Sequence, residues 1–290
     1  MEARPDEGNI EPQALTVSKK PGYIRRMLRI LGLALTALLF GGCAATPQGP
    51  YWGADATPSP GWARIGDAAL AAATDPVTWA PALGAAGLQI GDADDEIAEW
   101  ANEETPLFGS RGTAADASDG LRAASWGAYA LAGLFAPAPQ QGDWLATKAK
   151  GFAVGGGAIL ATLGTTQLLK DTVDRTRPLG QDRDSFPSGH TSSASVSARL
   201  GRNALGYYDL SRGARIGSDI GLAGLAVMTG WARVEAGEHH PADVLASMAL
   251  GNFLAVFATK AFLEPTAGGT ARLQVAPSRD GIALGLNLSF

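Results

Sequence analysis

Residues 187–205 read Pro-Ser-Gly-His-Thr-Ser-Ser-Ala-Ser-Val-Ser-Ala-Arg-Leu-Gly-Arg-Asn-Ala-Leu, a turn-forming start followed by small side chains. From Trp62 to about Leu263 the chain is rich in Ala, Leu and Gly and poor in β-branched runs, which favours helices. The Ser-rich stretch after Pro187 is one of them, with a helix expected over 189–205. The sequence therefore predicts an all-α fold, a helical bundle over residues 61–264. The other expected helices are 63–73, 76–89, 93–103, 115–135, 142–170, 213–232 and 241–263.

Two uncharged stretches leave open whether this bundle is globular or enters a membrane. Residues 151–169 and residues 244–259 contain no Asp, Glu, Lys or Arg. Glycines and polar residues weaken membrane insertion of the first, and the second is shorter than the ~20 residues that a span needs. Buried helices of a globular bundle are the favoured interpretation, and membrane spans are the alternative.

The N-terminal segment has the features of an export signal. Lys and Arg residues precede an apolar run at 30–42, which ends at Cys43, the single cysteine of the chain. This run is too short to cross a bilayer. Gly41-Gly42-Cys43 resembles a bacterial lipoprotein cleavage box, so we expect residues 1–42 to be a signal segment and Cys43 to be lipidated. An uncleaved anchor is the alternative, and translation starts at Met1 or Met27.

Segments of different composition flank the helical region. Residues 43–60 are rich in Pro and Gly and are predicted to form a tether. Residues 265–290 are predicted to form a short C-terminal β-hairpin. Apolar residues alternate strictly along 282–290, and Asp280-Gly281 is a turn signal.

Composition excludes several classes of protein. The chain has 46% hydrophobic residues, a formal net charge of −5 and a pI near 5.2. A nucleic-acid-binding protein would present a basic face, so no nucleic-acid partner is expected. One cysteine allows neither an internal disulfide nor a thiolate metal cluster.

All three histidines of the chain lie in three clusters of polar residues. The expected helices begin or end at these clusters, so an up-and-down arrangement brings all three to one end of the bundle. The sequence therefore predicts a pocket built from loops at helix ends. The clusters are Lys170 with Arg177-Pro178, Pro187-Ser188-Gly189-His190, and Arg233 with His239, His240 and Asp243.

A phosphoryl group fits the chemistry of this pocket. Lys170, Arg177 and Arg233 supply positive charge, and Arg presents a fork of N–H groups that matches phosphate oxygens. Ser188-Gly189 at a helix start adds free backbone N–H groups. One histidine can attack phosphorus while another protonates the leaving oxygen, and Asp243 can orient the nucleophile.

These motifs, Lys170-x6-Arg177-Pro178, Pro187-Ser188-Gly189-His190 and Arg233-x5-His239-x3-Asp243, resemble the three signature motifs of the type 2 phosphatidic acid phosphatase superfamily. The resemblance covers about residues 120–263. It implies an all-helical core and hydrolysis of phosphomonoesters or diphosphates without a metal or other cofactor. Ala232 stands where that family usually has Ser. The roles implied are His239 as the nucleophile, Asp243 as its orienting carboxylate, His190 as the general acid, and Lys170, Arg177, Ser188, Gly189 and Arg233 as phosphate-binding residues.

The expected function is hydrolysis of membrane-lipid phosphomonoesters or diphosphates through a phosphohistidine. A periplasmic non-specific acid phosphatase acting on small soluble phosphomonoesters is the alternative. A vanadium-dependent haloperoxidase and a non-catalytic lipoprotein scaffold are more distant ones. The expected location is the periplasmic side of a membrane, as an outer-membrane lipoprotein held by its N-terminal lipid anchor.

Two other chemistries compete for the same residues. His239-His240 with Glu235, Glu238 and Asp243 could hold a metal, but adjacent histidines point apart and nearby cations repel a divalent ion. Ser188 could be the nucleophile of a serine hydrolase, but no Gly-x-Ser-x-Gly elbow surrounds it.

Overall fold

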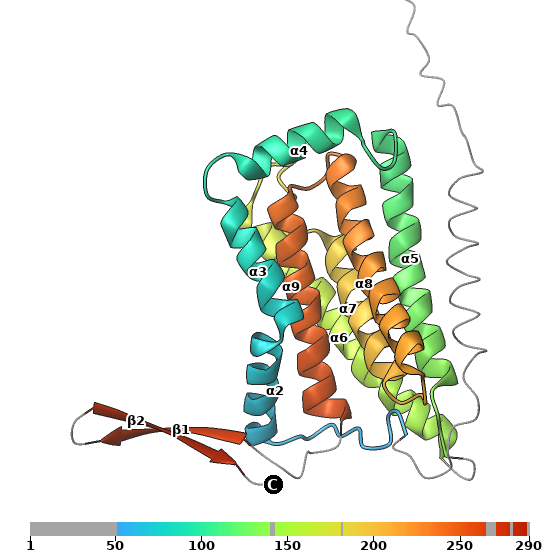
Figure 1. Cartoon of the computed structure of the whole chain (residues 1–290), viewed down its shortest axis with the longest axis vertical. Helices are drawn as coiled ribbons and strands as arrows, with labels where there is room; N and C mark the ends of the chain where they lie inside the picture. The colour runs from blue at the N-terminus through green and yellow to red at the C-terminus, as the bar shows by residue number, and fades with distance from the viewer. Residues whose placement is uncertain (1–50, 140–142, 181, 265–270, 279–280, 289–290) are drawn as a thin grey trace, which may run out of the picture.

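The computed structural model of the chain describes residues 51–139, 143–180, 182–264, 271–278 and 281–288. Helices make up the body of the molecule (Figure 1), which confirms the predicted all-α class. The elements are α2 (Trp62–Thr74), α3 (Pro76–Leu88), α4 (Ala93–Glu104), α5 (Arg111–Phe135), α6 (Trp144–Val173), α7 (Gly189–Leu205), α8 (Arg212–Glu235), α9 (Pro241–Ala258), the π-helical turn η1 (Thr259–Leu263), β1 (Ala271–Ser278) and β2 (Gly281–Leu288).

The helices fall close to the ranges expected from composition, and the ends differ where caps decide them. The helix predicted over 115–135 begins at Arg111, because the Ser110 side chain accepts a hydrogen bond from the Thr113 N–H and caps α5 four residues earlier. The helix predicted over 142–170 continues to Val173, where Asp174 adopts a left-handed conformation with φ of 53°.

The terminal predictions fall mainly outside the described residues. The signal segment over 1–42, the lipidation site Cys43 and residues 43–50 are not described. β1 and β2 pair antiparallel, with Ala271 opposite Leu288. Only the backbone of these two strands is described, so the predicted C-terminal hairpin and its packing on the helical body stay predictions.

Residues 51–60, the described half of the predicted tether, lie against the bundle rather than apart from it. The Trp52 side chain is 1% exposed and meets Tyr129 and Phe152 edge to face. Gly53 has a φ of 92°, and a Cβ at this position would collide with the Thr147 carbonyl. Burial of a large aromatic side chain therefore holds this part of the chain on the helices.

Helix α7 is the centre of the bundle, where it contacts α5, α6, α8 and α9. Its small Ser, Thr and Ala side chains over residues 191–198 are all buried. Small side chains let the neighbouring backbones come close. A Cβ at Gly251 of α9 would press against the backbone at Ser192 and Val196 of α7. This close packing fixes the start of α9 relative to the start of α7.

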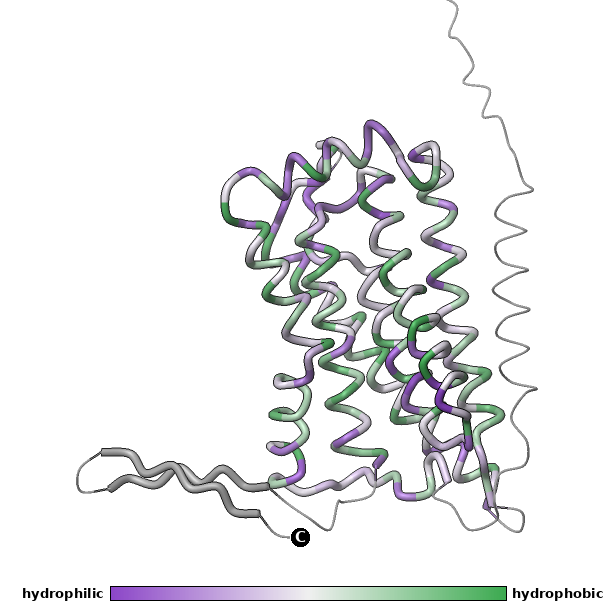
Figure 2. Tube along the Cα trace, in the orientation of Figure 1, coloured by the Kyte–Doolittle hydropathy of each residue, from purple (hydrophilic) through white to green (hydrophobic). Residues whose placement is uncertain are grey.

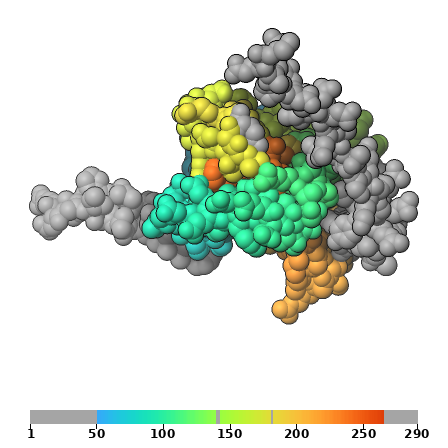
Figure 3. Space-filling view, turned by 90° about the horizontal axis from the view of Figure 1, so that it is seen from above, coloured from blue at the N-terminus to red at the C-terminus, as the bar shows by residue number. Residues whose placement is uncertain are grey.

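Helix α4 runs across one end of the bundle, where α5, α7 and α9 begin and α6 and α8 end (Figure 1). Figure 2 shows hydrophilic residues gathered on α4 and in the loops of this end. Figure 3 looks down onto it and shows α4 beside the yellow segment that connects α6 to α7. The three polar clusters of the sequence therefore meet at this one end.

Among the described residues, two helical stretches are long and apolar enough to cross a membrane, by length and composition only. They are α6 and the continuous segment Pro241–Leu263, whose apolar windows are 22% and 56% buried inside the protein. The α6 side chains Leu160 and Leu168 are 70% and 63% exposed. These helices are weak evidence for association with a membrane.

Candidate active site

Arg233 is the central cation of the candidate site and lies in the last turn of α8. The residue is 9% exposed, its Nη1 lies 3.5 Å from the Ser118 hydroxyl, and its Nη2 lies 3.1 Å from a carboxylate oxygen of Glu238. Burial, together with the charge of Arg177, lowers its pKa to about 10. The buried Nε has no hydrogen-bond partner among the described residues. Arg233 thus offers a desolvated N–H donor to an incoming oxygen.

His239 is enclosed in the turn between α8 and α9, with 2% of its surface exposed. Its Nδ1 lies 2.5 Å from the Ser185 carbonyl oxygen. Burial, and then the charge of Arg233, hold the pKa of this imidazole well below its usual value. A carbonyl oxygen only accepts hydrogen bonds, so Nδ1 carries the proton and Nε2 keeps its lone pair.

His190 lies in the first turn of α7 and pairs with Asp119 of α5. Its Nε2 is 2.8 Å from Asp119 Oδ1. Burial and the charge of Arg233 lower the pKa of His190 to about 4, although Asp119 raises it. The hydrogen bond from His190 in turn lowers the pKa of Asp119. Arg233 therefore acts on both His190 and His239, which the sequence separates by 49 positions.

The other two predicted cations surround the same space. The Arg177 guanidinium pairs with Glu238 through Nη1 and with Asp182 through Nε, at 2.7 Å. The Lys170 ammonium donates to the Asp184 carbonyl, and burial lowers its pKa. Lys170 interacts electrostatically with Arg177 and also lowers the pKa of His239. Arg233 and Lys170 thus act on the His239 imidazole, and Arg177 lies beside Arg233, with which it shares Glu238.

Ser188, an expected phosphate-binding residue, has hydrogen-bond partners within the protein, and its contact with phosphate stays a prediction. It is fully buried, its hydroxyl accepts from the Thr191 N–H and the Thr191 hydroxyl, and its own N–H donates to the Ser247 hydroxyl at 2.7 Å. Ser188 therefore caps α7. The N–H groups of Gly189 and His190, in the first turn, have no acceptor within the helix and face the helix start.

Asp243, the expected orienting carboxylate, has direct partners other than His239 among the described residues, and its role toward the nucleophile stays a prediction. Its carboxylate instead accepts from the Ser185 hydroxyl at 2.5 Å, the His240 N–H at 2.9 Å and Arg175 Nη1 at 2.7 Å. Asp243 sits in the first turn of α9, so its carboxylate is held by the capping box at that helix start. The link to His239 runs through Ser185, whose hydroxyl meets Asp243 and whose carbonyl meets His239.

Arg175 joins this network to helix α4. Its Nη2 lies 2.7 Å from the carboxylate of Asp94, which is 4% exposed. Asp94 also accepts from the Ala242 N–H at 2.8 Å. Burial alone would raise the pKa of Asp243, but hydrogen bonds from His240 and Ser185 and the charge of Arg175 lower it. The ion pairs fix α4 over the start of α9.

Glu235 and Glu238 were candidate metal ligands in the sequence, and each has different hydrogen-bond or ion-pair partners in the structure. Glu235 accepts from the Leu107 and Phe108 N–H groups, both at 3.0 Å, and Glu238 pairs with the arginines. Among the residues that the structure describes, no group of three or more His, Cys, Asp or Glu side chains is arranged to hold a metal ion. The positive charges of Arg177 and Arg233 would also repel a divalent cation at this place.

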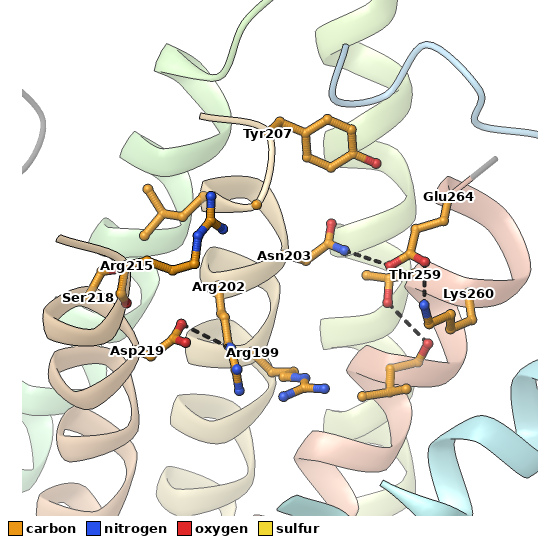
Figure 4. A pocket seen from close by; sticks show the side chains of 13 residues that line it. Arg199, Arg202, Asn203, Tyr207, Arg215, Ser218, Asp219, Thr259, Lys260 and Glu264 are labelled. Atoms are coloured by element: carbon orange, nitrogen blue, oxygen red, sulfur yellow. Dashed lines mark hydrogen bonds and ion pairs between the residues drawn. The ribbon is translucent and has the colours of Figure 1, made fainter. Parts of the chain in front are cut away.

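Cavities lie at both ends of the bundle, and their chemistry differs. One of about 600 Å³ adjoins the candidate site and is lined by Arg175, Arg177 and His240 opposite α4. Another, of about 500 Å³, lies at the far end (Figure 4). Its Arg202 is paired with Asp219 and its Lys260 with Glu264. The far cavity has no histidine in its lining, so the histidine chemistry is confined to the end covered by α4.

Sequence reasoning missed four residues of this site. Asp119 gave no local signal, because it lies 71 positions from its partner His190. Asp94 lies still further along the chain from Asp243. In the sequence it is one of several acidic residues of the same expected helix, so nothing distinguishes it from its neighbours. Arg175 stands inside the first motif, between Lys170 and Arg177, and Ser185 stands between the first two motifs. Their polar side chains beside Arg177 and Pro187 were the available signal.

Residues 152–266 match the sequence model of the PAP2 superfamily, which supports phosphatase activity in general. No curated protein matches the chain. A solved structure, the first transmembrane PAP2 type phosphatidylglycerolphosphate phosphatase from Bacillus subtilis, is 19% identical. The likeness covers 63% of this chain and 92% of that one at a TM-score of 0.37, too low to support an argument about function.

Proposed function

From the match of residues 152–266 to the sequence model of the PAP2 superfamily, we propose that the chain is a metal-independent phosphatase acting on membrane-lipid phosphomonoesters or diphosphates through a phosphohistidine. The observation that carries the proposal is the action of one buried guanidinium, Arg233, on both His190 and His239. A cation near both imidazoles can bind a phosphoryl group between them. One histidine can then attack the phosphorus while the other protonates the leaving oxygen.

His239 is the proposed nucleophile. The bond to the Ser185 carbonyl keeps the proton on Nδ1, and the lowered pKa keeps the ring neutral, so Nε2 can attack. The Nε2–phosphorus bond forms as the bond from phosphorus to the leaving oxygen breaks. Asp243 then acts as a positioning residue, because it holds the Ser185 hydroxyl and through it the segment that bears the carbonyl.

His190 is the proposed general acid. It transfers its proton to the leaving oxygen and later accepts one from the water that hydrolyses the phosphohistidine. In the free protein its pKa is about 4. A bound phosphoryl group adds negative charge beside the ring, which raises that pKa and favours the protonated form. Asp119 orients the imidazole at 2.8 Å.

The phosphoryl oxygens are proposed to lie among Lys170, Arg177 and Arg233. The N–H donors at the start of α7, at Gly189, add to these charges, and Ser188 contributes by capping that helix. The free Nε of Arg233 supports this placement, because a desolvated donor stabilises an oxygen on which charge develops.

Apolar side chains beside these cations favour a lipid substrate. Val173, one helical turn after Lys170 on α6, is 47% exposed, and Leu179, which follows Arg177-Pro178, is 37% exposed. Such a surface suits a phosphate approached from a bilayer.

We propose that the enzyme is exported and held at the periplasmic side of a membrane through a lipid on Cys43. Exposed Asp119 and Asp182 give the rim a polar side as well, so soluble phosphomonoesters are the second candidate.

The deciding experiment measures phosphate release from phosphatidate, isoprenyl diphosphate, a nucleotide and p-nitrophenyl phosphate, each with EDTA and with or without detergent. We expect release that EDTA does not reduce, that vanadate blocks, and that is fastest with the lipids in detergent. Acid-labile, base-stable labelling of the protein by ³²P-substrate should report the phosphohistidine. Loss of activity in EDTA would overturn the metal-independent mechanism.

A further inference from the structure

Within the part of the chain that the structure describes, Glu238 is the one carboxylate that contacts both of the proposed phosphate-binding arginines. A single oxygen, Oε2, pairs with Arg177 Nη1 and lies 3.1 Å from Arg233 Nη2. The neighbouring acids differ: Asp182 pairs with Arg177 alone, and Glu235 is occupied by backbone N–H groups. An anionic oxygen held between two guanidinium groups has the geometry that a phosphoryl oxygen would adopt there.

The turn that bears Glu238 keeps this side chain in place. Its backbone N–H donates to the Arg233 carbonyl at 3.1 Å, and Gly237 before it has a φ of 71° and packs against Leu179. The next residue is His239. The carboxylate therefore enters the space between the arginines from the same short turn that bears the proposed nucleophile.

We propose that Glu238 occupies, in the free protein, the position of a phosphoryl oxygen between Arg177 and Arg233, so that a phosphate must displace it to bind. This inference rests on the proposed function. The competition makes Glu238 a specificity-determining residue. A ligand with a single carboxylate carries the same charge as the Glu238 side chain that it would displace, so it gains no electrostatic advantage. A phosphoryl dianion carries more negative charge, and it can also reach Lys170 and the unpaired Arg233 Nε.

Two substitutions separate the position of the carboxylate from its charge. Glu238→Gln keeps the size of the side chain and removes the charge. Glu238→Asp keeps the charge but shortens the reach, so that one oxygen no longer spans both guanidinium groups. Asp182→Asn is the matched control, because it removes a carboxylate from Arg177 and leaves the shared position between the arginines occupied.

The experiment measures orthovanadate and inorganic phosphate binding to the full chain by calorimetry in detergent, alongside KM and kcat for p-nitrophenyl phosphate. We expect Glu238→Gln and Glu238→Asp to bind vanadate at least about tenfold more tightly than the wild type, and Asp182→Asn to stay within about threefold. KM should fall in both Glu238 variants, with kcat changed less. Acetate at high concentration should inhibit Glu238→Gln more than the wild type.

The outcomes distinguish this inference from the proposed function. If the wild type hydrolyses phosphate esters but neither Glu238 variant binds vanadate more tightly, Glu238 supports the arginines instead of competing, and the inference is wrong. Equal tightening by Asp182→Asn would also overturn it, because the effect would then be one of net charge. If the wild type neither binds vanadate nor releases phosphate, the proposed function itself fails.

Discussion

The Nδ1 atom of His239 lies 2.5 Å from the carbonyl oxygen of Ser185, in the segment just before α7. This bond joins the turn after α8 to the start of α7, and it leaves Nε2 as the basic nitrogen of a buried, neutral ring. The adjacent His240 is held differently: its Nδ1 lies 3.3 Å from both the Ser185 hydroxyl and Asp243. Two neighbouring histidines thus have different surroundings and different expected roles.

His239→Ala should abolish hydrolysis, whereas His240→Ala should keep most of it. The first substitution removes the atom that would bond to phosphorus. The second loses hydrogen bonds within the Asp243 network and should lower the free energy of unfolding by about 1–3 kcal/mol. Phosphate release and urea unfolding of both variants provide the measurements. The reverse ranking of activities would assign the nucleophile to His240.

Arg233→Met should lower kcat by about 10³-fold, the scale found for a preorganised donor in a transition state. The substitution removes the cation that acts on both imidazoles, together with the unpaired Nε donor. Arg202→Met is the matched control, because Arg202 pairs with Asp219 at the far end of the bundle. Steady-state kinetics on p-nitrophenyl phosphate will compare them. A similar loss in both variants would indicate a general structural effect.

The pH profile should be acidic and should depend on Asp119. The proposed acid, His190, has its pKa lowered to about 4, chiefly by burial, so its protonated fraction declines as pH rises above that value. We therefore expect kcat/KM to fall with rising pH, approaching tenfold per unit. The Asp119 carboxylate raises the pKa of His190. Asp119→Asn should move the profile to lower pH, and a shift to higher pH would contradict the assignment.

Arg175→Met should destabilise the fold by about 3 kcal/mol at neutral pH, because it leaves Asp94 and Asp243 without their shared cation. The pKa of Asp243 is lowered in the folded protein, so its contribution to stability is present above its usual pKa and is lost as pH falls through the lowered one. The difference in urea unfolding between the variant and the wild type should therefore shrink in acid. A difference that grows in acid would argue against the ion pairs.

Trp52→Ala should cost about 3–5 kcal/mol of unfolding free energy, since Trp52 is 1% exposed and packs between Tyr129 and Phe152. Trp62→Ala, at a side chain that is 88% exposed, should change it by less than about 0.5 kcal/mol. Thermal or urea unfolding monitored by circular dichroism compares the two. Equal effects would mean that residues 51–60 behave as a free tether.

Much of the architecture was predictable because it depends on local composition. Ala-rich and Leu-rich stretches indicated each of the helices α2 to α9 near its observed position. The clusters at Lys170, at His190 and at Arg233 were predictable for the same reason, since each occupies the end or start of a helix. Side-chain partners were less predictable. Ser188 turned out to cap a helix, and Asp243 bonds Ser185 and Arg175 in place of His239.

The sequence by itself determined that the chain is helical and that its histidines and cations occur at helix ends, because helix propensity and motif spacing are properties of neighbouring residues. Only the tertiary structure decided that Asp119 meets His190, that Arg175 ties Asp94 to Asp243, and that Glu238 lies between Arg177 and Arg233. These contacts join residues of the helices and of the segments that connect them. The packing of α5, α6, α8 and α9 around the small side chains of α7, with α4 against α8 and α9, sets their geometry, and no local pattern along the chain encodes it.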